Sequence, residues 1–382
     1  MTVTGPEGFT ASGVAAGIKA DALDLALVVN EGPQYTAAGV FTSNRFPAAP
    51  VTWSRQVLTT GTVRAVVLNS GGANACTGPE GFADTHATAE KVAETLGIGA
   101  IDVAVCSTGL IGERLPMDAV LSGVDSASAV LSADGGPDAA RAIMTTDTKP
   151  KNVTVSGDGY SIGGIGKGAG MLAPGLATML CVFTTDALLE PSIASAALRA
   201  ACGVTFDRLD SDGSMSTNDT VLLLASGASG VIPDVKAFGA ELTSACHDLA
   251  RQLLGDAEGS TKDVAITVRG AASVDDAVTV GRRIARDNLV KCALFGADPN
   301  WGRILAAVGT TDAAFEPDAV NVAVNGVWIC KGGAAAADRS TVDLTGRAVD
   351  LTVDLNAGDE TATIWTNDLS HAYVHENSAY SS

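Results

Sequence analysis

The sequence predicts an α/β protein with a layered α/β body and a smaller, β-rich C-terminal lobe. Strand-like runs alternate with helical patterns along most of the 382 residues, which is typical of α/β layers. Only 4% of the residues are aromatic, whereas Ala, Val and Gly are abundant, and this composition suits closely packed layers joined by tight turns. Near the end of the chain, alternating strands are joined by Asn-Gly and Gly-Asp turns. We therefore expect a body over about residues 1–270 and a lobe over about residues 271–382.

The elements of the body follow from local patterns. Strands are predicted where β-branched and aliphatic runs end in Gly, Ser or Asn, over 63–70, 101–108, 220–227 and 264–271. The segment 152–166 alternates around Gly-Asp-Gly and predicts a β-hairpin. A helix is predicted over 234–254, where apolar residues form one stripe, and another over the Ala-rich segment 191–203.

The lobe is predicted to contain three alternating strand stretches, NVAVNGVWIC, AVDLTVDL and ATIWTND. The Ala-rich stretch GGAAAADRS at 332–340 is expected to be an exposed loop. The stretch LSHAYVHEN is predicted to be extended, so that His371 and His375 would not share a helical face.

Composition excludes several function classes. The formal charge of −19 produces a surface that repels phosphate backbones and anionic lipid, which disfavours nucleic-acid and membrane-surface partners. No run approaches the roughly 18 apolar residues of a membrane span. The first thirty residues lack a basic segment followed by an apolar one, so we predict a cytoplasmic protein.

The seven cysteines are scattered and form no C-x-x-C pair, which disfavours both a disulfide framework and a zinc site. The four histidines are also dispersed. The sequence therefore predicts no metal site.

A glycine-rich loop with one lysine, GGIGKGAG, opens the most informative stretch. A P-loop needs Ser or Thr after the lysine, and here Gly168 follows Lys167, so that interpretation fails. The ordinary interpretation is a hairpin-to-strand connection. The alternative is that Lys167 approaches a ligand carboxylate or a nucleophile, because glycine allows the backbone to come close.

The same stretch continues as MLAPGLATMLCVF, with a single threonine between a Pro-Gly turn and an apolar run. Thr178 is most simply a β-branched residue that suits a strand. Alternatively, its hydroxyl attacks the Ala177 carbonyl and converts the amide to an ester, whose hydrolysis frees an α-amine with a pKa of roughly 7.7–8.0. That amine could then act as general base to its own hydroxyl.

Such chemistry requires oxyanion donors. In CSTGLIG, Thr108 and Gly109 follow a predicted strand, where a hydroxyl and a backbone N–H could face a developing oxyanion. Taken alone, the same residues form an ordinary strand-to-loop turn.

Together, these motifs resemble the ornithine acetyltransferases of arginine biosynthesis, which are self-cleaving enzymes with a threonine nucleophile. The matching stretches cover nearly the whole chain in the right order: NSGGANACTG (69–78), CSTGLIGERLPMD (106–118), AIMTTDTKPK (142–151), KGAGMLAPGLATMLCVFTTDA (167–187), STNDTVLLLASGASG (216–230), DAEGSTK (256–262), FGADPNWGR (295–303) and YVHENSAYSS (373–382).

The resemblance implies a layered α/β sandwich of the ornithine acetyltransferase and aminopeptidase type. It implies cleavage between Ala177 and Thr178 into an α chain of 1–177 and a β chain of 178–382, with two copies of each in a heterotetramer. Thr178 would be the nucleophile, and Thr108 and Gly109 the oxyanion hole. The implied substrate contacts are Thr145 (with Thr146 and Thr148 beside it), Lys167, Thr178, Glu258, Asn377 and Ser382.

The implied reaction moves the acetyl group of N2-acetylornithine to glutamate in two half-reactions, through an acetyl-Thr178 ester and without a cofactor. Acetyl-CoA as a second donor stays open. Two alternatives also stay open: a self-cleaving aminopeptidase or amidase, and a non-catalytic module that binds amino acids and remains one intact chain.

Overall fold

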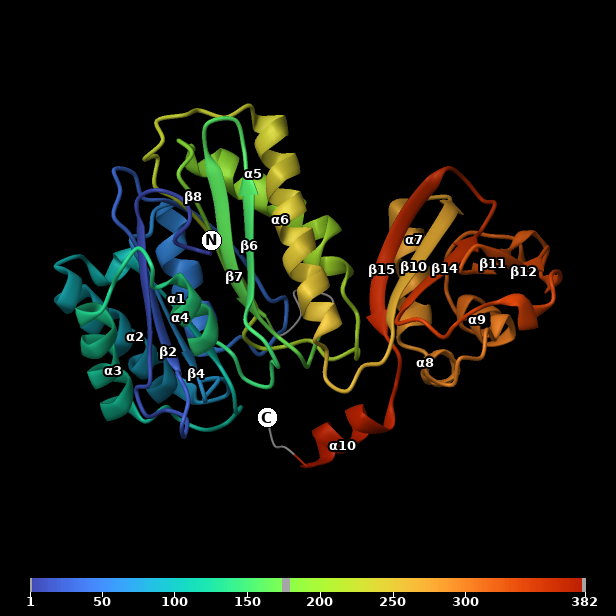
Figure 1. The fold of residues 1–382 in the computed structure, drawn as a ribbon, viewed down its shortest axis with the longest axis horizontal. Coiled ribbons are helices and arrows are strands. Elements are labelled where there is room, and N and C mark those ends of the chain that lie inside the picture. The colour runs from blue at the N-terminus through green and yellow to red at the C-terminus, as the bar shows by residue number, and fades with distance from the viewer. Residues whose placement is uncertain (1, 174–178, 380–382) are drawn as a thin grey trace.

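The structure is a computed structural model that describes residues 2–173 and 179–379. The predicted residues Ala177, Thr178 and Ser382 lie outside the described residues. The chain forms a larger body and a smaller C-terminal lobe beside it (Figure 1). This arrangement confirms the predicted α/β fold class.

Two sheets pack face to face in the body, and helices cover both outer faces (Figure 1). The first sheet has the order β1 (Phe9–Val14), β2 (Leu25–Asn30), β4 (Ala65–Ser70) and β5 (Val103–Thr108). The second has the order β3 (Thr36–Phe41), β9 (Thr220–Ala225), β8 (Leu180–Thr185), β7 (Ser161–Lys167) and β6 (Lys151–Ser156). The pairs β4–β5 and β8–β9 are parallel, and the other neighbours are antiparallel.

The helices of the body bury apolar stripes against these sheets. Around the first sheet lie α1 (Ala49–Val57), α2 (Gly78–Leu96), α3 (Met117–Ala129) and α4 (Gly136–Ala142). The second sheet is covered by α5 (Pro191–Val204) and α6 (Val235–Gly255). The predicted helices over 191–203 and 234–254 and the hairpin over 152–166 are confirmed.

The central strands are apolar along their whole length because both of their faces are covered. In β8, Leu180 and Val182 face the core between the sheets. Cys181 and Phe183 face the core beneath α5 and α6. This double burial fixes the position of each strand end, and the candidate site is built from such ends.

The outer edge of β5 is closed by α1 rather than by another strand. The Trp53 indole donates to the Val103 carbonyl (2.9 Å). The Ser54 hydroxyl donates to the Val105 carbonyl (2.7 Å) and accepts the Val105 N–H (2.9 Å). Side chains therefore satisfy the backbone of an otherwise open edge, and β5 is held straight up to Thr108.

The lobe is one six-stranded sheet packed against α7 (Val274–Ala285). Its strand order is β13 (Ala334–Ala335), β12 (Val327–Lys331), β11 (Asn321–Val324), β14 (Ala348–Asp354), β10 (Asp263–Ala271) and β15 (Glu360–Asn367). Two short helices, α8 (Asn288–Phe295) and α9 (Trp301–Val308), complete it. Because β10 is a central strand of this sheet, the lobe's sheet begins at residue 263 rather than near residue 271.

The predicted extended conformation of LSHAYVHEN is wrong. Residues His371–Ala379 form the helix α10, which places His371 and His375 one turn apart. No residue of α10 is buried, so its sequence has no apolar stripe from which a helix could be predicted. His371 packs edge-on against the Phe295 ring at 5.4 Å. No cluster of three or more metal-ligating side chains exists among the described residues.

The exposed loop predicted at 332–340 includes the exposed two-residue strand β13 and a 3-10 turn at Arg339–Thr341. Three further 3-10 turns lie in the body at Leu58–Thr60, Ala100–Asp102 and Phe206–Arg208, and one in the lobe at Pro317–Ala319. Within residues 2–173 and 179–379, no helix combines the length and the hydropathy that a membrane crossing requires.

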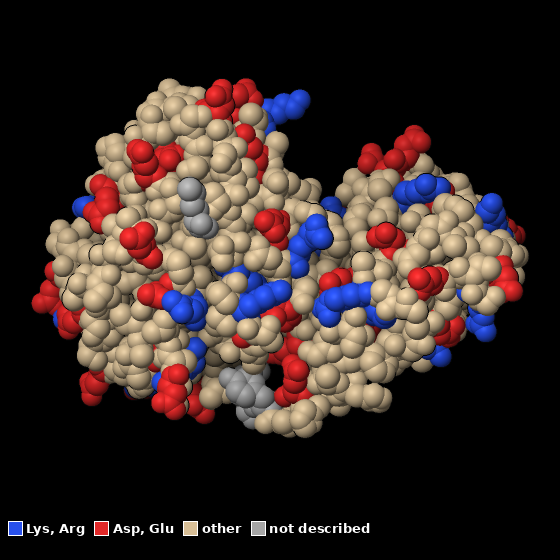
Figure 2. Space-filling view, viewed as in Figure 1, with Lys and Arg blue, Asp and Glu red and all other residues tan. Residues whose placement is uncertain are grey.

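Acidic side chains are spread over body and lobe on the face shown in Figure 2, whereas basic side chains gather where the two parts meet.

One buried lysine connects the body to the lobe. Lys291 on α8 is buried and donates to the Ser211 carbonyl of the body (2.7 Å). It also donates to Thr366 Oγ1 (3.2 Å) and to the Asn367 carbonyl at the end of β15.

Burial lowers the pKa of Lys291 from 10.5 to about 8, although nearby aspartates oppose this shift. Between these two pH values the unfolded chain binds a proton that the folded chain does not, so folding becomes more favourable as pH rises. We expect the free energy of unfolding of the wild type, relative to Lys291→Met, to increase by about 3 kcal/mol from pH 8 to pH 10.5. Urea unfolding at several pH values measures this difference, with the exposed Lys236→Met as control. A difference independent of pH would contradict the burial of a charged Lys291.

Candidate active site

The structure brings together all six predicted site residues that it describes. Residues from five separate segments line one small cavity of about 60 Å³: Thr108, Gly109, Ile111, Thr145, Thr146, Lys167, Gly170, Met171, Glu258 and Asn377. The other three predicted site residues, Ala177, Thr178 and Ser382, are outside the described residues.

Thr108 and Gly109 lie where β5 ends against the loop that follows β4. The Thr108 carbonyl accepts the N–H groups of Gly71 (2.9 Å) and Gly72 (3.1 Å). Gly109 has a φ of 133°, and a Cβ there would lie 2.5 Å from the Gly72 nitrogen. Only glycine fits this position, so the strand can turn sharply and keep the Thr108 hydroxyl at the cavity.

Lys167 approaches the same hydroxyl from the second sheet. It ends β7, is 2% exposed, and its Nζ lies 3.3 Å from Thr108 Oγ1. Burial lowers the pKa of Lys167, and the neighbouring Asp147 carboxylate acts against that shift. A donor hydroxyl and a buried ammonium therefore meet at one end of the cavity.

Glu258 supplies the opposite charge. Its carboxylate accepts the Thr146 hydroxyl (2.8 Å) and the Asn377 amide (3.0 Å), and its N–H donates to the Ala169 carbonyl (2.9 Å). A Cβ at Gly170 would lie 2.7 Å from the carboxylate oxygens, so a side chain there would displace Glu258.

The three neighbouring threonines have different positions. Thr145 lines the cavity, and its N–H donates to Asp147 (3.0 Å). Thr146 lines the cavity as well and contacts Glu258 through its hydroxyl. Thr148 points away, with its hydroxyl and N–H on Asp256. Sequence reasoning did not single out the Thr146–Glu258 contact, although Thr146 was named beside Thr145.

The sequence analysis did not predict the buried ion network that lies beneath the cavity. Lys151 is fully buried between Asp147 (2.6 Å) and Asp256 (2.5 Å). Asp147 also accepts the Gly168 N–H (2.7 Å). Burial alone would raise the pKa of Asp147, but the charges of Lys167 and Lys151 outweigh it and lower the pKa to about 2. The stretches TTDTKPK (145–151) and DAE (256–258) contain these residues, and their partners became visible only in the fold.

Asn377 reaches Glu258 from the lobe, on α10. The helix can pass close to the body because a Cβ at Gly259 would lie 2.2 Å from the Tyr373 nitrogen, a space that glycine leaves free. The Ser370 hydroxyl donates to the Gly259 carbonyl at the start of the helix. Hydrogen bonds rather than apolar packing therefore place α10 against the site.

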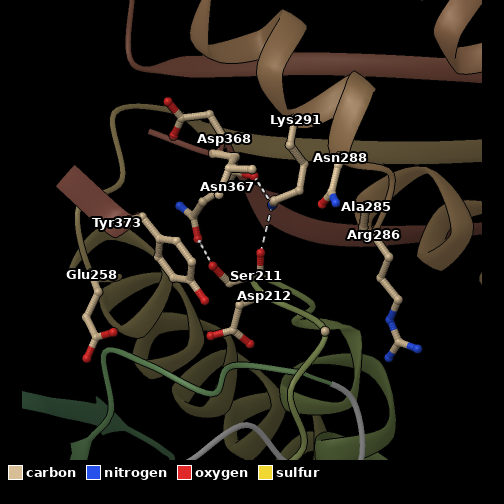
Figure 3. Close-up of a pocket in the computed structure, with 12 residues that line it drawn as sticks. Ser211, Asp212, Glu258, Ala285, Arg286, Asn288, Lys291, Asn367, Asp368 and Tyr373 are labelled. Atoms are coloured by element: carbon tan, nitrogen blue, oxygen red, sulfur yellow. Dashed lines mark hydrogen bonds between the residues drawn. The ribbon is translucent and has the colours of Figure 1, made fainter. Parts of the chain in front are cut away.

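A larger cavity of about 270 Å³ lies between body and lobe and shares Glu258 as a wall. In Figure 3 the Tyr373 hydroxyl points toward Asp212, and Lys291 bonds to Ser211 and Asn367 in the back wall. Burial raises the pKa of Tyr373 to about 12, so its hydroxyl stays a donor at neutral pH. Together the two cavities offer hydroxyl and ammonium donors on one side of Glu258 and a polar space on the other.

The family is shown by sequence comparison. A sequence model of the ArgJ family matches residues 10–382. The chain belongs to the ArgJ family. The "Arginine biosynthesis bifunctional protein ArgJ" of Streptomyces coelicolor is 64% identical over 383 residues, which cover 100% of both chains. The protein of the same name from Mycobacterium tuberculosis strain H37Rv is 60% identical over 100% of this chain and 96% of its own.

A solved structure of ornithine acetyltransferase from M. tuberculosis, complexed with ornithine, has 62% sequence identity to this ArgJ chain. It covers 47% of this chain and 96% of its own, with a TM-score of 0.45. The family model and the curated relatives confirm the predicted family, and this ArgJ chain is an acyltransferase of arginine biosynthesis.

The buried network generates a prediction on stability. Asp147→Asn should lower the free energy of unfolding by about 2 kcal/mol at neutral pH, because the folded pKa of about 2 lies below the ordinary 3.8. The contribution is complete above pH 3.8 and is lost as pH falls through 2. Urea unfolding from pH 7 to pH 2.5 measures it. Asp138→Asn, which removes the exposed ion pair with Arg141, is the control and should change stability by less than about 1 kcal/mol. Equal effects of the two substitutions would contradict the role of the network.

Proposed function

We propose that this ArgJ chain transfers the acetyl group of N2-acetylornithine to glutamate through an ester on Thr178. One observation carries the proposal: Thr108, Gly109, Lys167 and Glu258 line one cavity at the end of β7. Leu180 of β8 is the register partner of Lys167, and Thr178 precedes Leu180 by two positions in the sequence.

Maturation is proposed as the first step. The Thr178 hydroxyl oxygen attacks the Ala177 carbonyl carbon, the C–N bond between the two residues breaks, and an ester forms while the hydroxyl proton passes to the released nitrogen. Water then cleaves the ester and leaves a carboxyl group on Ala177 and a free hydroxyl and α-amine on Thr178. Hydrolysis therefore adds the hydroxyl group of water to the carbonyl carbon of Ala177 and a proton to the side-chain oxygen of Thr178. No cofactor takes part.

The acetyl transfer uses the same hydroxyl. Its proton moves to the α-amine of Thr178, and its oxygen attacks the acetyl carbon of N2-acetylornithine. The Thr108 hydroxyl and the Gly109 N–H are the proposed donors to the oxyanion. When the amide C–N bond breaks, the departing amine of ornithine takes the proton. The amine of glutamate then attacks the carbonyl carbon of the acetyl ester. The ester C–O bond breaks and a proton of the glutamate amine passes to the Thr178 oxygen, which yields N-acetylglutamate and restores the threonine.

The charges of the cavity support this choice of substrates. Glu258 suits the ammonium group of ornithine, and Lys167 suits a carboxylate. The M. tuberculosis relative, whose structure contains ornithine, supports the same substrate class. The word "bifunctional" in the relatives' names supports a second donor, and we propose acetyl-CoA for that role. We further propose substrate contacts by Thr145, Asn377 and Ser382, and a cytoplasmic heterotetramer of two 1–177 and two 178–382 fragments.

The maturation step is tested by intact mass under denaturing conditions. The wild type is expected as two fragments whose masses place the cut between residues 177 and 178, whereas Thr178→Ala stays one chain. Incubation of the cut enzyme with N2-acetylornithine should add one acetyl mass to the 178–382 fragment. An intact wild-type chain that transfers acetyl groups would contradict the threonine mechanism. Release of acetate without transfer to glutamate would favour an amidase.

The proposed role of Glu258 is tested by Glu258→Gln, which keeps the shape and removes the charge. We expect KM for N2-acetylornithine to rise about 10- to 100-fold, because a charge-assisted contact to the ammonium is lost. Steady-state kinetics measure this change. Glu241→Gln, at the Tyr160 hydroxyl on the outer side of the second sheet, is the matched control and should leave KM unchanged. Similar KM values in all three proteins would refute the ammonium contact.

A further inference from the structure

Asp219, which no step of the proposed reaction uses, holds the residue that follows Thr178. It lies directly before β9, and its Oδ1 accepts the Met179 N–H at 3.0 Å. The Met179 carbonyl in turn accepts the Thr220 N–H at 3.1 Å. The first described residue after Thr178 is therefore fixed on both of its backbone groups by residues 219 and 220.

The neighbouring Asn218 connects this position to β5, which ends at Thr108. Its amide donates to the Ser107 carbonyl (2.8 Å) and to the Ala73 carbonyl (2.6 Å). Ser107 immediately precedes Thr108. The dipeptide Asn218-Asp219 therefore links the end of β5, where the proposed oxyanion donors lie, to the start of β8.

The second oxygen of Asp219 accepts no hydrogen bond of normal geometry from the residues that the structure describes. Asp219 is 0% exposed, and the Ser216 side chain lies near enough to favour the ionised carboxylate without completing such a bond to Oδ2. Leaving a buried carboxylate oxygen unpaired is unfavourable, and such a group calls for a donor. Asp219 therefore has one oxygen, Oδ2, available for a donor, while its other oxygen, Oδ1, holds Met179, the residue after the proposed nucleophile.

We propose that Asp219 is a positioning residue that fixes the chain after Thr178 through Oδ1 and pairs through Oδ2 with the α-amine released by cleavage. This inference rests on the proposed function, because only cleavage before Thr178 creates that amine. Asp219 forms no covalent bond. The proton still moves from the Thr178 hydroxyl to its own amine and then to the leaving amine, and Asp219 balances the positive charge in between.

Several charged and polar groups face Asp219 from the surrounding elements. Lys167 on β7, the Met179 N–H directly before β8 and the Ser216 side chain before β9 favour its ionised form, whereas Asp207 in the turn after α5 disfavours it. Burial is the largest effect and raises the pKa of Asp219 well above its ordinary value. A cationic α-amine beside Oδ2 would offset this burial and keep the carboxylate ionised.

The pH dependence of the reaction tests the pairing. The α-amine must be unprotonated to act as base, so activity rises with pH through its pKa. Removing the carboxylate charge with Asp219→Asn lowers that pKa. We expect the acidic limb of the kcat/KM profile for acetyl transfer from N2-acetylornithine to glutamate to move toward lower pH by roughly one unit. Asparagine keeps an acceptor for the Met179 N–H.

Asp186→Asn is the matched control. Asp186 is a buried aspartate at the opposite end of β8, where it accepts the N–H groups of Ser161 (2.7 Å) and Glu7 (3.1 Å). Its substitution should leave the acidic limb in place. If Asp219→Asn does not fold, Asp219→Ser, which is smaller and uncharged, is measured in the same way.

The outcomes separate this inference from the proposed function. A wild type that is cut and acetylated on the 178–382 fragment, combined with an unchanged acidic limb in Asp219→Asn, overturns the role of Asp219 alone. An uncut or unacetylated wild type overturns both. A folded Asp219→Asn protein that stays uncut while Asp186→Asn is cut supports the positioning role, because the chain next to the bond is then misplaced.

Discussion

The candidate site depends on one buried cation. Lys151 lies between Asp147 and Asp256, two carboxylates that come from segments more than a hundred positions apart in the sequence. Removing either partner leaves buried charge uncompensated, which is strongly unfavourable. The network therefore fixes three backbone segments together: the loop of Thr145 and Thr146, the turn at Gly168 after Lys167, and the segment of Asp256 that leads to Glu258. The cavity is the space that these segments enclose with the end of β5.

Three glycines also let the segments around the cavity come close together. Gly109 allows β5 to turn against Gly72, Gly170 makes room for the Glu258 carboxylate, and Gly259 makes room for the backbone of α10. At each position a Cβ would lie within 3 Å of another atom. The glycine-rich character of the motifs therefore reflects how tightly strand ends and loops converge here. The polar side chains can reach one small cavity because the backbones that carry them nearly touch.

Much of the fold could be predicted because burial leaves a periodic trace in the sequence. The strands β4, β5, β8 and β9 and the helix α6 are buried on one or both faces, and their apolar patterns showed it. The helix α10 buries nothing and is held by Ser370 and Asn377, so periodicity carried no signal. Thr108, Lys167 and Glu258 could be named from motifs. The pairing of Lys151 with Asp147 and Asp256 could not, since it depends on which distant segments meet.

Two carboxylates differ from the others in this region: Glu258, which lines the cavity, and Asp219, which holds the chain before β8. The two buried lysines, Lys151 and Lys167, balance the charges of Asp147 and Asp256, so the network beneath the cavity is close to neutral. Among the described residues, Glu258 and Asp219 make hydrogen bonds but no ion pair. In the proposed reaction each meets a cation: Glu258 the ammonium of the substrate, and Asp219 the α-amine that cleavage creates. Because the network beneath the cavity is close to neutral, its lysines do not also neutralise Glu258 and Asp219, and these two carboxylates can pair with a cation that arrives with the substrate or is created by maturation.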